Sequence, residues 1–204
     1  MRTLFRTVAV AFLTALTTTA NADTLTEALF QGQVQQSFDG NKLASCGVVI
    51  AGLELANSGN VLMFNGSFAL HDLRGGLVKG SASEIPAKLV GTGDSQKHIR
   101  HLRVEKVWFK GHGAPRTTVL EGSKANRGED PRFVLYATEL ESLSGVLQSI
   151  SDKQPIQIGV RVAGRKFDQV LFGVVNLSDA QFAQLSQCIV EWSKSILDKH
   201  KANQ

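Results

Sequence analysis

The chain has little of what marks the specialised classes of protein. Its 204 residues include only two cysteines and four prolines, and two cysteines are too few for a small disulfide-dense scaffold. Charged residues make up 20% and no low-complexity tract occurs, which argues against disorder. The 19 glycines do not recur at every third position, so the chain is not collagen-like. A compact globular protein remains.

Sequence signatures of catalysis and of cofactor binding are also missing. The chain contains no G-x-S-x-G nucleophile motif, no H-E-x-x-H zinc motif and no G-x-G-x-x-G after an expected strand. Gly75 and Gly80 have the spacing of a phosphate-binding loop, but Ser81 stands where that loop needs a lysine. No cofactor or metal is therefore predicted, and the sequence favours a non-enzymatic protein without settling the question.

The N-terminus has the layout of a secretory signal peptide. Arg2 and Arg6 precede a short apolar stretch, and the small residues Ala20 and Ala22 follow it. The apolar stretch, 7–16, is shorter than the roughly 20 residues that cross a bilayer. We expect cleavage after Ala22, which leaves a single globular domain over 23–204 in the periplasm or outside the cell.

Loss of Arg2 and Arg6 would lower the formal net charge from +4 to +2. Nucleic acid is therefore not an expected partner, because its binding depends on a strong basic surplus.

The two cysteines are predicted to form a disulfide bond. Cys46 and Cys188 are an even pair in a chain expected to pass through an oxidising compartment. The bond would link a strand near the start of the domain to the last helix. Neither cysteine belongs to a C-x-x-C motif, so a structural role is expected rather than a redox role.

The first two thirds of the domain alternate short apolar runs with turns, a pattern typical of strands and hairpins. Asn57 to Asn60 is the turn between the first two runs. The strands expected on this ground span 46–53, 61–70, 77–78, 99–109, 119–120 and 133–137. Before them, Thr24 to Glu27 has the capping-box pattern, which predicts a short helix over 24–30.

The last third is predicted to contain a helix, a hairpin and a second helix. Capping boxes begin at Thr138 and at Ser178, and apolar residues at helical spacing follow each of them, so helices are expected over 139–151 and from 178 to about 199. Between them, alternation over 156–163 and an apolar run over 168–175 indicate a hairpin. The fold class expected is α+β, with a mostly antiparallel sheet, single or sandwich-like.

A basic segment, residues 97–116, is the most unusual part of the sequence. It holds six lysines and arginines against one glutamate, a local charge of +5. Such a segment can meet an anionic envelope component or an acidic protein face, with an aromatic residue as anchor. The alternative is an ordinary solvated strand face, since alternation sends the cations to both sides. The candidate binding residues are Arg100, Arg103, Lys106, Trp108 and Lys110.

Histidines offer weaker candidates for chemistry. His98, His101 and His112 lie in the basic segment, but positions 98 and 101 of a strand point to opposite faces, which disfavours a shared zinc ion. His71, next to Asp72 near the end of an expected strand, is a second candidate, acting with a serine.

Three functional hypotheses follow. The first is an exported, non-enzymatic interaction or accessory protein that contacts an envelope protein or an anionic envelope component. The second is a small envelope hydrolase or metal-dependent enzyme, and the third is a carrier of a small apolar ligand inside the core. Under the first hypothesis, replacing both Arg100 and Arg103 by Glu is expected to weaken partner binding and leave the fold intact.

Overall fold

The computed structural model describes residues 24–55, 59–72, 75–126, 130 and 132–202. The predicted signal peptide, 1–22, lies outside the described residues, and so do two residues of the predicted turn, Asn57 and Ser58. The described helices do not include one that is both long and apolar enough to cross a membrane.

One sheet of ten strands and two α-helices make up most of the described chain. The strands are β1 (Thr24–Asp39), β2 (Lys42–Glu54), β3 (Asn60–Asp72), β4 (Gly75–Pro86), β5 (Arg100–Leu102), β6 (Val104–Lys110), β7 (Val134–Glu139), β8 (Ile156–Val162), β9 (Gln169–Gly173) and β10 (Val175–Asn176). The helices are α1 (Leu140–Ser151) and α2 (Asp179–Ala202), and two short 3₁₀ turns, η1 (Ala87–Leu89) and η2 (Ser95–His98), follow β4.

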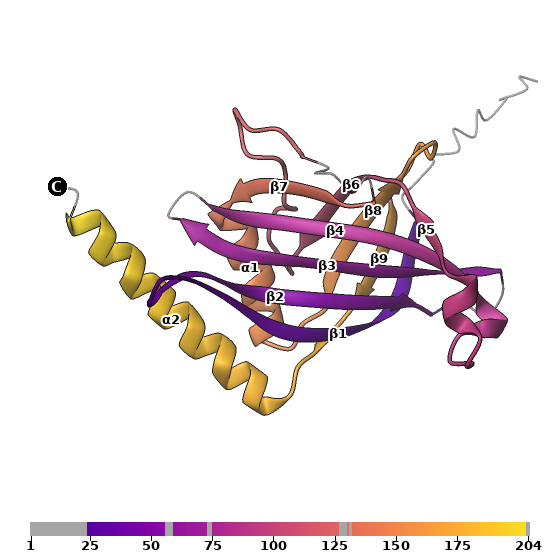
Figure 1. Cartoon of the computed structure of the whole chain (residues 1–204), viewed down its shortest axis with the longest axis horizontal. Coiled ribbons are helices and arrows are strands. Elements are labelled where there is room, and N and C mark those ends of the chain that lie inside the picture. Colours follow the sequence, from indigo (N-terminus) through magenta and orange to yellow (C-terminus); the bar gives the residue numbers. More distant parts are fainter. Residues whose placement is uncertain (1–23, 56–58, 73–74, 127–129, 131, 203–204) are drawn as a thin grey trace, which may run out of the picture.

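The sheet is nearly closed into a barrel. Long strands β1 to β4 lie side by side in antiparallel order (Figure 1). Beyond β4 the chain forms β5, which pairs with β4, and then β6, which pairs with β8 on the other side of the barrel. Because β8 pairs with β9 and β9 pairs with β1, the path of strands almost returns to its start. The predicted hairpin of the last third is β8 and β9.

The α+β class is confirmed, but the sheet is mixed, since β1 runs parallel to both β9 and β10. These parallel pairs exist because 24–30 forms a strand, so the predicted helix there is wrong. Ala28 and Phe30 are buried, whereas Glu27, Leu29 and Gln31 are exposed. This alternation fits a strand with one face on the core and outweighs the local capping-box pattern.

Aromatic rings from opposite walls meet in the core. Phe109 of β6 is fully buried, and its ring centroid lies 5.7 Å from that of Phe64 and 5.3 Å from that of Phe68, both on β3. Both pairs have the edge-to-face geometry that aromatic rings prefer. The strand that closes the barrel is therefore anchored in the core by its phenylalanine.

The two helices pack on different parts of the sheet, and α1 contacts mainly β6 and β4. Helix α1 begins at Leu140, and the capping box expected at its start does not form, because the Thr138 hydroxyl is buried without a hydrogen-bond partner. Helix α2 packs on β2 and β1 and runs along the left of Figure 1. Its predicted capping box is confirmed: the Gln181 amide N–H donates to Ser178 Oγ at 3.3 Å, and Ser178 N–H donates to Gln181 Oε1 at 2.9 Å.

The predicted disulfide between Cys46 and Cys188 is confirmed. It joins β2 to the buried stripe of α2, and both cysteines are fully buried. Because the bond closes a loop of 142 residues, it greatly restricts the unfolded chain. The disulfide is compatible with an extracellular or periplasmic location.

A buried hydrogen-bond network connects β6, β7 and the segment after β6. The Phe109 N–H donates to Thr117 Oγ1 at 2.9 Å, and the hydroxyls of Thr117 and Tyr136 lie 2.8 Å apart. Tyr136 in turn donates to the Val107 carbonyl at 2.8 Å. Burial raises the pKa of the Tyr136 phenol to about 12, and the hydrogen bond with Thr117 opposes this shift.

Removing the disulfide is expected to destabilise the protein. The double variant Cys46→Ala/Cys188→Ala should lose roughly 2–5 kcal/mol of unfolding free energy, because the unfolded chain is no longer cross-linked. Urea unfolding monitored by circular dichroism measures this difference. Ser186→Ala, on the exposed side of α2, is the control. An unfolding midpoint equal to that of the wild type would contradict the structural role.

Tyr136, the one tyrosine of the chain, makes the network directly measurable. Its folded pKa is raised, so the stability that it contributes is complete below about pH 10, the pKa of an unfolded tyrosine, and is lost as the pH rises towards about 12. We expect tyrosinate absorbance to appear with a midpoint near pH 12 in native protein and near 10 in denaturant. A native midpoint near 10 would show that the phenol is solvated.

Candidate functional site

The outer face of β1 to β5 carries a groove of about 840 Å³. Neither α-helix lies over it: α2 packs on β2 through Cys188, and Cys46 belongs to the inward-facing row of that strand. The segment with the 3₁₀ turns, at the right of Figure 1, flanks the groove and contributes Ile99. Val174, between β9 and β10, lines the groove at its opposite end, next to β1.

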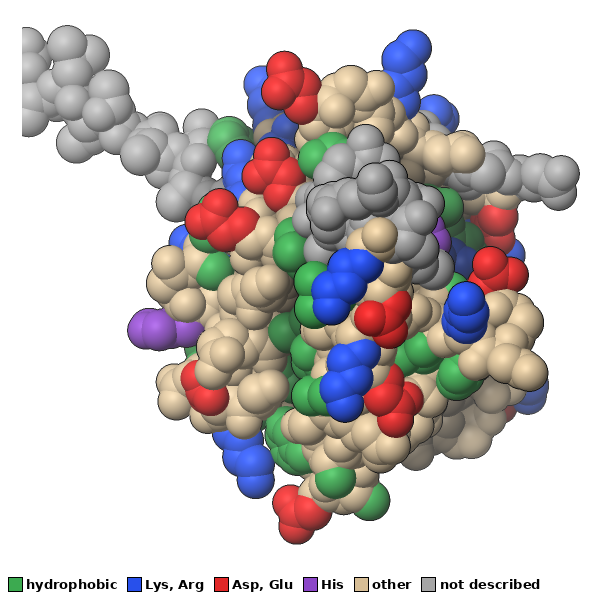
Figure 2. All heavy atoms as spheres, turned by 90° about the vertical axis from the view of Figure 1, so that its left-hand side faces the viewer, with side chains coloured by type: hydrophobic (Ala, Val, Ile, Leu, Met, Phe, Trp, Pro, Cys, Tyr) green, Lys and Arg blue, Asp and Glu red, His purple; other side chains and the backbone are tan. Residues whose placement is uncertain are grey.

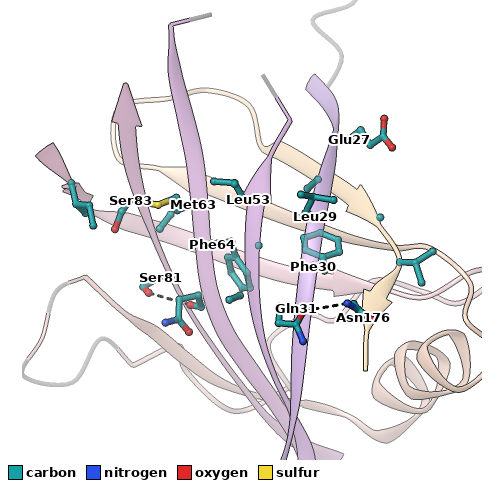
Figure 3. A pocket seen from close by; sticks show the side chains of 18 of the residues that line it. Glu27, Leu29, Phe30, Gln31, Leu53, Met63, Phe64, Ser81, Ser83 and Asn176 are labelled. Carbon is teal, nitrogen blue, oxygen red and sulfur yellow. Dashed lines mark hydrogen bonds between the residues drawn. The ribbon is translucent and has the colours of Figure 1, made fainter. Parts of the chain in front are cut away.

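One row of the groove is apolar and ends in a polar pair. Leu29, Leu53, Met63, Ser83 and His101 are successive cross-strand neighbours from β1 to β5. Figure 3 shows the first four of these side chains next to one another. Leu29 is 61% exposed, which is high for a leucine at the centre of a sheet. This row offers apolar surface to a ligand.

The neighbouring row is polar. Asn176, Gln31, Ala51, Asn65 and Ser81 are successive neighbours from β10 to β4. The Asn176 side-chain amide donates to Gln31 Oε1 at 3.3 Å, and the Ser81 hydroxyl donates to the Asn65 carbonyl at 3.1 Å (Figure 3). The groove therefore combines an apolar floor with hydrogen-bonding groups along one side, the usual composition of a small-molecule site.

One pattern in the sequence indicates the groove. In β1, β2 and β3 the apolar residues Leu29, Leu53 and Met63 occupy positions that alternation assigns to the outer face. A strand with apolar residues on both faces is normally covered on both sides. An apolar outer row on several long strands indicates a face that something else covers.

The cations of the predicted basic segment lie on η2, β5, β6 and the residues beside these elements. Lys97 pairs with Asp94 at 2.8 Å, and Arg100 pairs with Glu84, a residue of β4 that is only 6% exposed. Arg165 donates to the same carboxylate at 2.7 Å. Arg100 thus serves a structural ion pair at the seam between β4 and β5.

Trp108, the expected aromatic anchor, is 4% exposed. Its Nε1–H donates to Asp168 Oδ2 at 2.7 Å, and Arg161 donates to the other oxygen of that carboxylate at 2.6 Å. The indole ring lies against Gly159, where a Cβ would stand 1.9 Å from the ring. The indole is therefore part of the packing between β6 and β8. It is not an exposed contact surface.

All six cations of the segment reach the surface, and Lys97, Arg100 and Arg116 are exposed. Arg103 is exposed, and Lys106 and Lys110 are half-buried. Their interaction with an anionic partner stays a prediction.

Among the histidine side chains that the structure describes, that of His101 hydrogen-bonds to a serine hydroxyl. His101 Nδ1 lies 3.0 Å from Ser83 Oγ, at the end of the groove. His71 instead lines a small pocket beside β4 and β7, and His98 and His112 are exposed. Within the residues that the structure describes, no group of three or more potential ligands lies close enough to hold a metal ion.

The carboxylate of Asp130 lies within electrostatic reach of His101. Its pKa is lowered to about 2, mainly because Arg132 donates hydrogen bonds to it, and the charge of His101 is the smallest contribution. Arg132 therefore largely neutralises this acid.

The end of the molecule beyond the groove has no single-sign patch. Figure 2 shows basic and acidic side chains interspersed over the face at the α2 end. The apolar Val190 of α2 is exposed there in a mixed-charge setting, with Gln187 bonded to Glu191. Substitutions on this surface can therefore serve as controls for substitutions in the groove.

No protein-family model, no curated protein and no solved structure matches this chain.

Arg100 and Arg103 are expected to respond differently to mutation. Arg100→Gln should cost about 1–2 kcal/mol of unfolding free energy, because the buried Glu84 loses one charged donor. Arg103→Gln should change stability by less than about 0.5 kcal/mol, since no ion pair to Arg103 is found among the described residues. Urea unfolding of both variants tests this. Equal losses would contradict the separate role of Arg100.

Proposed function

We propose that this chain is an exported binding protein that holds a small, mainly apolar ligand in the outer groove of β1 to β5. The observation that carries the proposal is the groove itself, with a volume of about 840 Å³ and a floor of Leu29, Leu53 and Met63. This volume falls in the range of small-molecule sites, roughly 300–1,000 Å³. The ligand would remove exposed apolar surface from water, which favours binding.

The proposal places the ligand outside the barrel rather than inside the core. The inner faces of the strands are filled: Phe64, Phe68 and Phe109 pack together, and each is at most 2% exposed. On the outer face, by contrast, Leu29 and Val174 keep 61% and 44% of their surface exposed. We therefore keep the carrier hypothesis but place the ligand on the outer face of the sheet instead of in the core.

Export to the periplasm or the cell exterior is the second part of the proposal. It is supported by the signal-peptide pattern over 1–22 and by the buried disulfide between Cys46 and Cys188. In either compartment a protein of this kind would keep an apolar molecule in solution or present it to another protein. An accessory role of this kind also agrees with the absence of a catalytic signature in the sequence.

The proposal is tested by placing a charge in the groove. Met63→Arg should weaken binding of a fluorescent alkyl probe about tenfold or more, because an apolar contact is replaced by a cation that loses water. Val190→Arg, the same type of change on the outside of α2, is the matched control and should leave probe affinity unchanged. Circular dichroism confirms that both variants are folded.

Two results would overturn the proposal. The first is equal probe affinity in Met63→Arg and Val190→Arg. The second is a protein partner that crosslinks in cells to a photoreactive residue at position 53 or 63, since the groove would then be a protein interface. Native mass spectrometry that detects a co-purified apolar molecule, lost in Met63→Arg, would support it.

A further inference from the structure

The groove is chemically different at its two ends. At the β5 end, Ser83 and His101 form a cross-strand pair joined by a hydrogen bond of 3.0 Å. At the β1 end, Glu27 is the charged lining residue. Between them, the apolar row from Leu29 to Met63 contains no charge. A ligand in this groove therefore meets donors at one end and a carboxylate at the other.

The acids near the β5 end of the groove are paired with arginines. Glu84 follows Ser83 in β4 and is paired with two arginines, Arg100 and Arg165. Asp130, the acid within electrostatic reach of His101, is neutralised by Arg132. Both acids near the polar pair are thus paired with arginines, and Glu84 points to the opposite face of the sheet from Ser83. An anionic group is favoured at this end and disfavoured beside Glu27.

The polar pair can supply the hydrogen bonds that an anion needs. When His101 carries its proton on Nδ1, the imidazole donates to Ser83 Oγ and the serine hydroxyl hydrogen points to another acceptor. When both ring nitrogens are protonated, Nε2–H is a second donor and the ring is positively charged. A carboxylate can accept from the serine hydroxyl or from the charged Nε2–H, which points away from the serine.

We propose that Ser83 and His101 bind the head of an alkyl carboxylate whose chain lies over Met63, Leu53 and Leu29. This inference rests on the proposed function and names the class of ligand. The row from β4 to β1 crosses three strand spacings, or about 14 Å at roughly 4.8 Å each. A single alkyl chain that starts at Ser83 would thus cover the apolar row and end before Glu27.

The same pair has the distance expected of a nucleophile and its base, so catalysis is the competing explanation. A base of this kind is normally oriented by a third group. Among the described residues, no carboxylate is hydrogen-bonded to His101. The geometry therefore favours binding of the head group, and a serine-directed probe distinguishes the two roles.

The experiment compares three probes with the same twelve-carbon chain, namely dodecanoate, dodecanol and dodecylammonium, by calorimetry on the mature protein below their micelle concentrations. The wild type should bind dodecanoate about tenfold more tightly than the other two. In Ser83→Ala/His101→Leu this preference should disappear, because the affinity for dodecanoate falls much more than the affinity for dodecanol. Ser67→Ala/His71→Leu, the same chemical change on β3 outside the groove, should keep the preference.

The possible failures are distinguishable. Equal affinity for dodecanoate and dodecanol in the wild type, or a preference for dodecylammonium, would overturn the carboxylate head and leave the proposed function standing. Binding of none of the three would overturn both. Covalent labelling of Ser83 by a fluorophosphonate would show a nucleophile instead of a head-group site. Loss of the preference in both double variants would show that the pair is not responsible.

Discussion

The fold depends on closure of the barrel by the consecutive strands β5 and β6, which pair with β4 and with β8. Without this crossing, Phe64 and Phe68 on the inner face of β3 would lose their contact with β6. Phe109 holds the crossing in place between Phe64 and Phe68, and the Thr117 and Tyr136 hydroxyls connect the same strand to β7. Strand β6 is thus held both by hydrophobic packing and by a buried hydrogen-bond network.

Closure also explains what happens to the basic segment. Because 97–110 crosses from one wall to the other, its side chains face a 3₁₀ turn, the seam of the sheet and the packing between β6 and β8 in turn. Arg100 neutralises Glu84 at the seam, and Trp108 is held by Asp168. The six cations of the segment reach the surface, but they are spread over η2, β5, β6 and the residues beside them.

Sequence patterns predicted the elements whose signals are local. The hairpin of β8 and β9, the capping box at Ser178 and the disulfide of Cys46 were all recognisable, because alternation, capping and an even cysteine pair need no tertiary information. The strand over 24–30 was missed, because the local capping-box pattern indicated a helix and the parallel partner β9 lies far along the chain. The Ser83 and His101 pair was missed for the same reason: only strand register brings these residues together.

The groove follows from the length of the four N-terminal strands. Strands of 12 to 16 residues extend beyond what the barrel needs, and their inner faces are completed by the two helices. The outer face has no such cover, yet it carries leucines and a methionine at register-matched positions. Stability alone gives little reason for an apolar row on an uncovered face, because its side chains bury only part of their surface on folding. A ligand that covers Leu29, Leu53 and Met63 gives these residues a function that the isolated fold does not.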